Sequence, residues 1–332
     1  MDYEVVYLNV ENADAILIKY SINNNDCIIL IDSGSVSSGE KIKDYITTKW
    51  YTNRINLAIC THPDSDHIGG FFYLFNDREV IIEELWVNTP HDVLVSPWGC
   101  LYEKTWKDES LKLFMHPTDS NSINLIDLAK AKGCVVDTAF TGKLYSFAPL
   151  LVLRPTREEF VSYANLMLNE SKSYSIKTDD SWPFIDTGDY SAQVARSEID
   201  SEKDDGSVTN ASSIILVFHP KENHKFLFLG DANRESIKKV LDKDINCWLR
   251  QCVVKVPHHG SRHNLSSSLI DKMQPKFSVI SAKGTVKHPS RGVVYCLARY
   301  GRVYSTHCNG NIVIKNGYLS CEFSNVPLKY KL

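Results

Sequence analysis

The stretch THPDSDHIGG, at residues 61–70, follows the apolar run INLAIC and contains two histidines and two aspartates within six positions. Histidine nitrogens and aspartate oxygens are ligands that hold divalent ions at about 2.0–2.2 Å. Alternate residues of an extended segment can aim one way, so His62, Asp64 and Asp66 can converge while His67 turns to a neighbouring position. Four ligands exceed what one ion needs beside its water, so this spacing predicts two ions about 3.5–4 Å apart. The competing interpretation is a polar turn whose aspartates cap the following helix.

Three later stretches also place chemically useful side chains after apolar runs. FLFLGDAN puts Asp231 at the end of a predicted strand, although a Gly-Asp turn is common there in any protein. VVKVPHHGS puts His258 and His259 after a buried strand and a proline, and a pair of surface-loop histidines is the alternative. TVKHPSRG contributes His288, which on its own is more often merely polar than functional. Because these positions fall where strands end, we expect a site held on a rigid frame.

Composition indicates an ordinary globular protein. The chain has 332 residues, a formal net charge of −3, 43% hydrophobic and 23% charged residues. No apolar run approaches the roughly 20 residues that cross a bilayer, and the first residues lack the basic region and apolar core of a signal peptide. The nine cysteines include no C-x-x-C pair, which favours a reducing compartment. We therefore expect a cytoplasmic protein that does not associate with membranes.

The order of predicted elements indicates an α/β fold. Short β-branched strands come first, followed by a helix and a buried strand that ends at the opening motif. A similar order of strands and helices returns after residue 209. This pattern predicts two sheets packed face to face with helices outside, in a single domain over residues 1–332. Two stretches depart from it and are predicted insertions: a Trp-rich one at about 88–120 and an acidic one at about 157–209. The acidic one is expected to be a functional loop or a mobile, structureless segment.

Charge is distributed unevenly along the chain. Residues 272–321 contain eight Lys and Arg and no Asp or Glu, whereas residues 158–205 contain twelve acids against four Lys and Arg. Lysine and arginine near the histidine motifs indicate phosphate neutralisation, and solvated charges without a partner are the alternative. The residues concerned are Lys255, Arg262, Lys283, Lys287 and Arg291. The acidic insertion is expected either to dock a protein partner or to lie over the basic face as a nucleic-acid mimic.

Together these stretches resemble the metallo-β-lactamase superfamily and, within it, the ComEC-type nuclease domain. DSG at residues 32–34 matches the first motif, and THPDSDHIGG matches the second, with Asp64 where many members carry histidine. NASS at residues 210–213, FLFLGDA and KVPHHGS match the later motifs. The resemblance covers almost the whole chain in order, apart from the two predicted insertions. ComEC itself carries membrane segments, so this chain is expected to be a stand-alone relative.

The resemblance implies an αββα sandwich of two mixed sheets with outer helices and a dinuclear metal site at one edge. It assigns the ligands as His62 and Asp64 for one ion, Asp66 and His67 for the other, Asp231 as a bridge, and either His258 or His259 to complete the second ion. Asp32 is expected to organise the loops. Many members supply another histidine where this chain has Asn210, so the first ion has a more oxygen-rich ligand set. Such a set suits manganese or magnesium, while zinc stays possible.

The chemistry implied is hydrolysis by a metal-bound hydroxide. Asp66 is expected to act as ligand and proton acceptor, His288 to contact the leaving group or phosphate, and Asn210, Ser261 and Lys287 to bind substrate. The leading prediction is a metal-dependent phosphodiesterase, a nuclease of ComEC type acting on nucleic acid. One alternative is a hydrolase of a small thioester or lactone on the same fold. The other is a scaffold or regulatory subunit of a larger complex.

Overall fold

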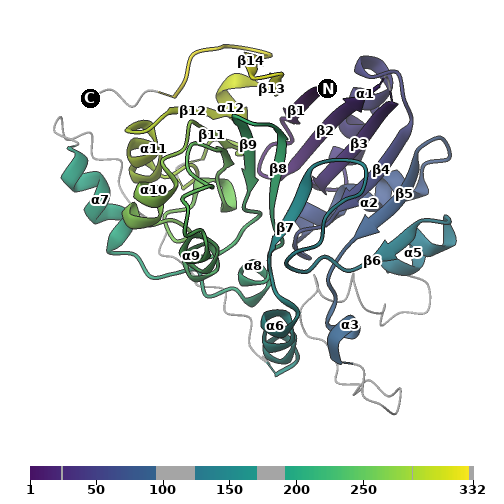
Figure 1. The fold of residues 1–332 in the computed structure, drawn as a ribbon, viewed down its shortest axis with the longest axis horizontal. Helices are drawn as coiled ribbons and strands as arrows, with labels where there is room; N and C mark the ends of the chain where they lie inside the picture. The colour runs from purple at the N-terminus through teal and green to yellow at the C-terminus, as the bar shows by residue number, and fades with distance from the viewer. Residues whose placement is uncertain (24, 95–123, 170–190, 286, 329–332) are drawn as a thin grey trace.

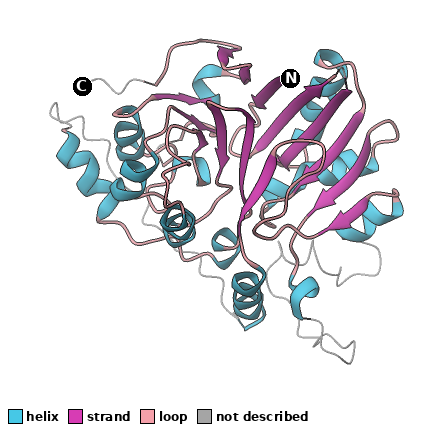
Figure 2. Ribbon diagram, viewed as in Figure 1, coloured by secondary structure: helices cyan, strands magenta, loops and turns pink. Residues whose placement is uncertain are grey.

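The computed structural model describes residues 1–332 except 24, 95–123, 170–190, 286 and 329–332. The described residues form two β-sheets packed face to face, with helices on both outer surfaces (Figures 1 and 2). This arrangement confirms the predicted αββα sandwich.

The larger sheet consists of β1 (Asp2–Tyr7), β2 (Ala15–Ile22), β3 (Asn25–Ser33), β4 (Arg54–Ile59), β5 (Ile81–Trp86), β6 (Val135–Asp137), β13 (Ile312–Lys315) and β14 (Tyr318–Cys321). Its order is β14-β13-β1-β2-β3-β4-β5-β6. The smaller sheet consists of β7 (Leu150–Arg154), β8 (Ile215–Lys221), β9 (His224–Phe228), β10 (Val253–Lys255), β11 (Phe277–Ile280) and β12 (Arg302–Ser305). Its order is β12-β11-β10-β9-β8-β7.

The described helices are α1 (Ser38–Lys49), α2 (Ser65–Asn76), α3 (Pro90–Leu94), α5 (Leu125–Ala131), α6 (Arg157–Asn169), α7 (Ala192–Asp200), α8 (Val208–Ala211), α9 (Arg234–Lys243), α10 (Ser267–Met273), α11 (Arg291–Ala298) and α12 (Thr306–Asn309), with a short 3-10 turn η1 (His258–Gly260). Among these helices, none combines the length and the apolarity that a bilayer crossing requires.

Three apolar layers hold the sandwich together. In β3, Ile29 and Ile31 face the layer between the sheets, while Ile28 and Leu30 face the layer under α1 and α2. In the smaller sheet, Phe226 and Phe228 point inward and Leu227 points outward to the layer under α9, α10 and α11. Strands buried on both faces read as continuous apolar runs, which explains sequences such as CIILI and FLFL.

Parallel pairing brings the motif loops to one edge of the sandwich. Strands β3 to β6 run parallel to one another, and so do β9 to β12. The carboxyl ends of β3 and β4 meet where Thr61 donates its backbone N–H to Asp32 Oδ1, at 2.8 Å. The loops after β9 and β10 meet where the backbone N–H of His258 donates to Asp231 Oδ1, at 3.1 Å. Loops after neighbouring parallel strands are where side chains from distant segments can converge.

The described parts of the acidic insertion are helical, so the expectation of a structureless segment is wrong there. They contain α6, α7 and α8. In α7, Ala195 and Ile199 are fully buried against α11, where a side chain on Gly292 would meet Ile199 at 2.9 Å. Two apolar residues four apart suffice to dock a helix, although the charged residues around them mask the pattern. Residues 170–190, and most of the Trp-rich stretch, lie outside the described residues, so both insertion boundaries stay predictions.

The acidic residues that follow α7 contact the C-terminal half of the chain. Asp200 accepts hydrogen bonds from the backbone N–H and hydroxyl of Ser267, and Glu202 forms an ion pair with Arg262 at 3.1 Å. Asp205 accepts a hydrogen bond from the amide of Asn264 at 3.1 Å. This segment therefore belongs to the packed structure around the loops after β9 and β10.

Candidate metal centre

The opening motif forms the loop after β4 and the first turn of α2. Two glycines allow α2 to approach the end of β3 closely: a Cβ on Gly70 would lie 2.1 Å from the carbonyl oxygen of Ser33, and one on Gly69 would lie 2.6 Å from the nitrogen of Val36. No other residue type permits this approach. Asp64 occupies the N-cap position of α2 but its side chain makes no capping hydrogen bond. The helix-capping interpretation of the motif is therefore wrong for this aspartate.

The two motif histidines face the carboxylate of Asp231. His67 Nε2 lies 3.4 Å from Asp231 Oδ2, and His62 Nε2 lies 3.9 Å from the same oxygen. His62 Nε2 is also 3.8 Å from Asp64 Oδ2. The two rings are stacked at a tilt, with centroids 4.1 Å apart. One carboxylate oxygen from the smaller sheet thus lies between two histidines from the larger sheet.

A second group of ligand atoms lies beside the first. His259 Nε2 is 3.1 Å from Asp66 Oδ2, and the ligand atoms of Asp66, His67 and His259 all lie within 4.8 Å of one another. The same limit holds for His62, His67 and Asp231. His67 belongs to both groups, so the two candidate ion positions are adjacent.

Each motif histidine has one ring nitrogen without a hydrogen-bond partner, as a metal ligand requires. His62 Nε2 and His67 Nε2 are buried and have no hydrogen-bond partner. Their other ring nitrogens are held, His67 Nδ1 by Asp32 at 2.7 Å and His62 Nδ1 by the Thr61 hydroxyl at 3.0 Å. Buried polar atoms almost always have a partner, and metal-binding histidines are usually held through the nitrogen that does not bind the ion. These residues therefore fit divalent ions, and Asp32 holds the ring of His67.

Burial and charge set the protonation of these groups. Burial, with His67 beside it, lowers the pKa of His62 to about 4, which leaves its ring neutral near pH 7. Burial opposes ionisation of Asp231, but His67, His258 and Lys255 outweigh it and hold the pKa of that carboxyl well below its usual range. Burial and the nearby Asp66 raise the pKa of Asp64 to about 6. The centre thus presents a neutral imidazole and an ionised central carboxylate.

The two adjacent histidines of PHHGS have different surroundings. His259 is buried, with Nδ1 2.9 Å from the carbonyl oxygen of Ser281 and Nε2 toward Asp66. His258 is partly exposed, and its Nδ1 lies 3.2 Å from Asp205 Oδ2. Burial opposes protonation of His258, but Asp231 and Asp205 outweigh it and raise its pKa to about 9.

The backbone separates the two rings. His258, His259 and Gly260 all adopt positive φ, at 45°, 53° and 80°. Consecutive left-handed residues are rare for side chains other than glycine and are concentrated at functional sites. The strained turn sends one ring into the cluster and the other to its rim.

The remaining predicted residues lie around the rim. The ring of His288 stacks on His258 with centroids 5.8 Å apart, and its Nδ1 is buried without a partner. Asn210 is buried, donates to Asp205 Oδ2 at 2.8 Å, and leaves its own Oδ1 without a partner. Ser261 is buried and its hydroxyl accepts the backbone N–H of His263 at 3.2 Å, so it stabilises the turn. Lys287 is exposed beside His288.

The interpretation of Lys255 as a phosphate-neutralising surface residue is wrong. Its side chain is 1% exposed and forms an ion pair with Asp14, which is equally buried. Its Nζ lies 3.7 Å from Asp231 Oδ1. Neither Asp14 nor Asp205, which lies 3.2 Å from His258 Nδ1, was predicted as part of the site. A lysine inside the otherwise apolar strand CVVKV was the available signal, because buried lysines occur almost only when paired.

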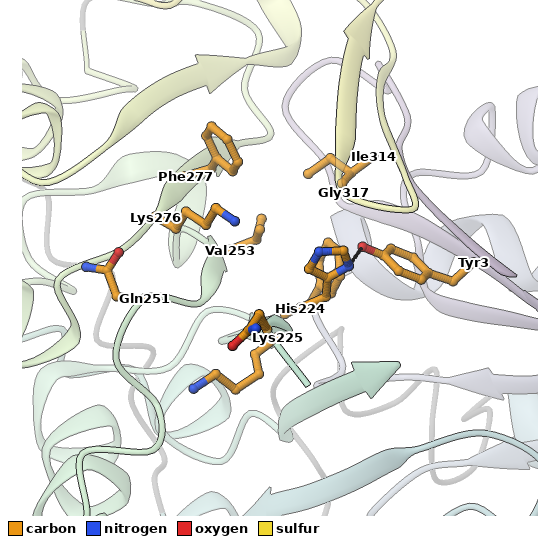
Figure 3. A pocket seen from close by; sticks show the side chains of 11 residues that line it. Tyr3, His224, Lys225, Gln251, Val253, Lys276, Phe277, Ile314 and Gly317 are labelled. Carbon is orange, nitrogen blue, oxygen red and sulfur yellow. Dashed lines mark hydrogen bonds between the residues drawn. The ribbon is translucent and has the colours of Figure 1, made fainter. Parts of the chain in front are cut away.

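A cavity at the opposite end of the smaller sheet has no such ligand set. It lies at the amino ends of β10 and β11 and holds about 20 Å³, which is room for about one water molecule. Figure 3 shows Tyr3 of the larger sheet in contact with His224 of the smaller one, and the Tyr3 hydroxyl lies 2.6 Å from His224 Nδ1. Among the described residues, those that line this cavity include no group of converging metal ligands.

Comparison with known proteins shows which protein family this chain resembles. A family model for the metallo-beta-lactamase superfamily matches residues 8–91. ComE operon protein 3 of Bacillus subtilis (strain 168) is 32% identical over 114 residues, which is 33% of this chain and only 14% of that much longer relative. Residues 8–91 therefore match the metallo-β-lactamase superfamily, and the ComE match agrees with the ComEC-type resemblance of the motifs.

Several solved structures are similar at low identity. A mutant of CmlA beta-hydroxylase is 12% identical with a TM-score of 0.48, over 95% of this chain and 54% of that one. A diphosphatase from the PhnP family is 9% identical with a TM-score of 0.43, over 97% of this chain and 99% of that one. MEM-A1, a subclass B3 metallo-beta-lactamase from a soil metagenome library, is 12% identical with a TM-score of 0.39, over 89% and 88%.

Proposed function

We propose that the protein is a metal-dependent phosphodiesterase whose centre binds two divalent ions. The observation that carries the proposal is the convergence of His62 and His67, each with an unpartnered Nε2, on one oxygen of Asp231. We assign His62 and Asp64 to one ion and Asp66, His67 and His259 to the other. Asp231 lies between them. His258 is left as a rim residue because its ring is partly exposed and its pKa is raised to about 9, whereas His259 is buried with Nε2 toward Asp66.

The charge of the centre supports the binding of divalent cations. Its five carboxylates outnumber its cations, the buried lysine and the rim histidine His258, whose pKa is raised to about 9. The groups are Asp14, Asp32, Asp64, Asp66, Asp231 and Lys255. Uncompensated charge is costly in a site shielded from water, so divalent cations would stabilise this ligand set.

Bound ions supply a water of lowered pKa and polarise the group under attack. Around them, this chain provides the proton and substrate contacts. The Asp66 carboxylate is about one-third exposed and lies 3.1 Å from His259, so it is placed to accept a proton from water on the open side. His288 stacks on His258 at the rim, where we place the phosphate or the leaving group. Asn210 and Lys287 border the same rim and are assigned to substrate binding.

The donor set supports a phosphodiester as the substrate. Asp64 and Asn210 replace nitrogen ligands by oxygen, and oxygen-rich sites favour manganese or magnesium, which suit phosphate oxygens. The ComE match supports nucleic acid as the finer substrate class. The exposed Lys287 lies beside His288 and is suited to a phosphate.

A small-substrate hydrolase is the second candidate, and the pairing of basic residues favours it. Lys255 is buried with Asp14, Arg262 pairs with Glu202, and Lys283 pairs with Glu11 at 3.0 Å. Less positive charge is therefore available to a long polyanion than the sequence predicted. A thioester or lactone needs no extended basic surface.

Hydrolysis assays distinguish these functions. Purified protein is tested on bis-p-nitrophenyl phosphate, on single- and double-stranded DNA, and on thioester and lactone substrates, each with manganese, magnesium or zinc. The double variant Asp66→Ala, His67→Ala removes ligands, and His224→Asn is the matched histidine control at the far end of the sheet. Metal-dependent cleavage of phosphodiesters that is lost only in the ligand variant supports the proposal. Cleavage of thioesters or lactones alone would replace it by the second candidate.

A further inference from the structure

A buried ion pair lies beneath the candidate metal centre and joins the two sheets. Asp14 belongs to the loop between β1 and β2 of the larger sheet, and Lys255 ends β10 of the smaller sheet. Each side chain is 1% exposed, and Lys255 Nζ donates directly to Asp14 Oδ2. Burying two charges carries a desolvation penalty that often exceeds their attraction, so apolar residues would join the sheets at least as well. Stability alone does not account for this pair.

Lys255 also contacts the loop that carries Asp231. Its Nζ donates to the carbonyl oxygen of Gly230 at 3.2 Å and lies 3.7 Å from Asp231 Oδ1. The same Oδ1 accepts the backbone N–H of His258 at 3.1 Å. Two positively polarised groups thus hold Oδ1, and Oδ2 is left facing His67 and His62.

Asp14 ties the same pair to the opening motif. Its backbone N–H donates to the carbonyl oxygen of Asp66 at 3.1 Å, and its Oδ2 lies 3.7 Å from His67 Nε2. Asp14 is also close enough to Asp32 and His67 to be counted with them as a possible ion-binding group. However, His67 Nδ1 is engaged by Asp32 and Asp14 Oδ2 by Lys255, so this group is a hydrogen-bonded cluster rather than a third ion site.

We propose that Lys255 and Asp14 form a positioning pair that fixes the direction of the Asp231 carboxylate, so that only Oδ2 is presented to the ions. The proposal rests on the proposed function of the centre as a dinuclear metal site. Lys255 lies beside Asp231 Oδ1 and donates to the carbonyl oxygen of the preceding Gly230, and Asp14 holds Lys255 while anchoring the loop that carries Asp66 and His67. Neither residue contacts the substrate.

A double-mutant comparison separates positioning from simple stabilisation. Lys255→Met removes one charge and leaves Asp14 buried without a partner, so the ion-free protein should unfold at a lower temperature. Adding Asp14→Asn removes the second charge, and the unfolding temperature should recover toward that of the wild type. Manganese affinity, measured by calorimetry, should stay about 10-fold or more below wild type in the double variant, because partners that orient metal ligands contribute about 10–100-fold.

The opposite result would overturn the proposal. A stable double variant that binds two ions with wild-type affinity would show that the pair serves stability only. If the double variant does not fold, Asp14→Asn alone provides the test, since Lys255 is retained. Its ion affinity should then exceed that of Lys255→Met, and equal losses would contradict the positioning role. A wild-type protein that binds no ions would instead overturn the proposed function itself.

Discussion

The two ends of the smaller sheet use the same residue types for different purposes. At the amino end, His224 hydrogen-bonds to Tyr3 (Figure 3), and its charged neighbours are the cations Lys276 and Lys221. At the carboxyl end, His67 and His259 face carboxylates, and His67 presents a buried Nε2 without a partner. A histidine held by a hydrogen bond is therefore not by itself a metal ligand. What marks the candidate metal centre is a held Nδ1 combined with an Nε2 that faces a carboxylate oxygen.

Removing the central carboxylate should have the largest effect on ion binding and hydrolysis at the carboxyl end of the sheet. Asp231→Asn takes away the charge between His62 and His67, so we expect the loss of at least one bound ion. Hydrolysis should fall by at least about 100-fold, more than the loss caused by residues that only orient ligands. Metal content by mass spectrometry and the rate with bis-p-nitrophenyl phosphate measure both effects. His224→Asn should change neither, and an equal loss in that variant would remove the distinction between the two ends.

The two histidines of PHHGS should differ in a way that sharpens the same comparison. His259→Ala removes the ring that faces Asp66, so the number of bound ions should fall from two to one. His258→Ala should keep both ions and lower the rate by roughly 10-fold, because it alters only the rim. Ion counts and kcat for both variants test this assignment. If His259→Ala retained two ions, the assignment of His259 as a metal ligand would be contradicted.

The sequence predicted the parts of the centre that follow directly from local pattern. Paired apolar strands, the spacing of His62 and Asp66, and the strand-end position of Asp231 were all visible in short stretches. The choice between His258 and His259 depends on a left-handed backbone turn, which residue types do not reveal. Asp14 and Lys255 are 241 positions apart, so their pairing needs the assembled sheets. Counting Lys255 as a surface charge failed because charge composition carries no information about burial.

Asp205 should have an intermediate effect. It accepts hydrogen bonds from Asn210 at 2.8 Å and from Asn264 at 3.1 Å, and it lies 3.2 Å from His258 Nδ1. Asp205→Asn keeps the shape but replaces an acceptor by a donor, so we expect a loss of rate of about 10-fold or less with both ions retained. The kinetics should be measured beside Asp204→Asn, whose carboxylate caps α9 instead. Equal effects of the two substitutions would show that the acidic segment acts through folding alone.

The smallest expected effect concerns stability at the amino end. Burial, reinforced by Lys276 and Lys221, lowers the pKa of His224, so the folded protein binds this proton less readily than the unfolded chain. The contribution of neutral His224 is complete above its unfolded pKa of about 6.5 and is lost as pH falls below that value. Tyr3→Phe removes its hydrogen bond and should lower the free energy of unfolding by about 1 kcal/mol at pH 7.5. Denaturant unfolding at pH 7.5 and 5.5 measures both effects. If the free energy of unfolding of the wild type exceeded that of His224→Asn by more at pH 5.5 than at pH 7.5, the expected direction of the pH dependence would be contradicted.

The central claim is that two ions bind where the histidines and carboxylates of the two sheets converge. Titrating ion-free protein with manganese, while counting bound ions and following hydrolysis of bis-p-nitrophenyl phosphate, tests it most directly. We predict two ions per chain, with activity appearing as the second one binds and absent from the Asp66→Ala, His67→Ala variant. Fewer than two ions at saturation, or hydrolysis that persists in the ligand variant, would contradict the account.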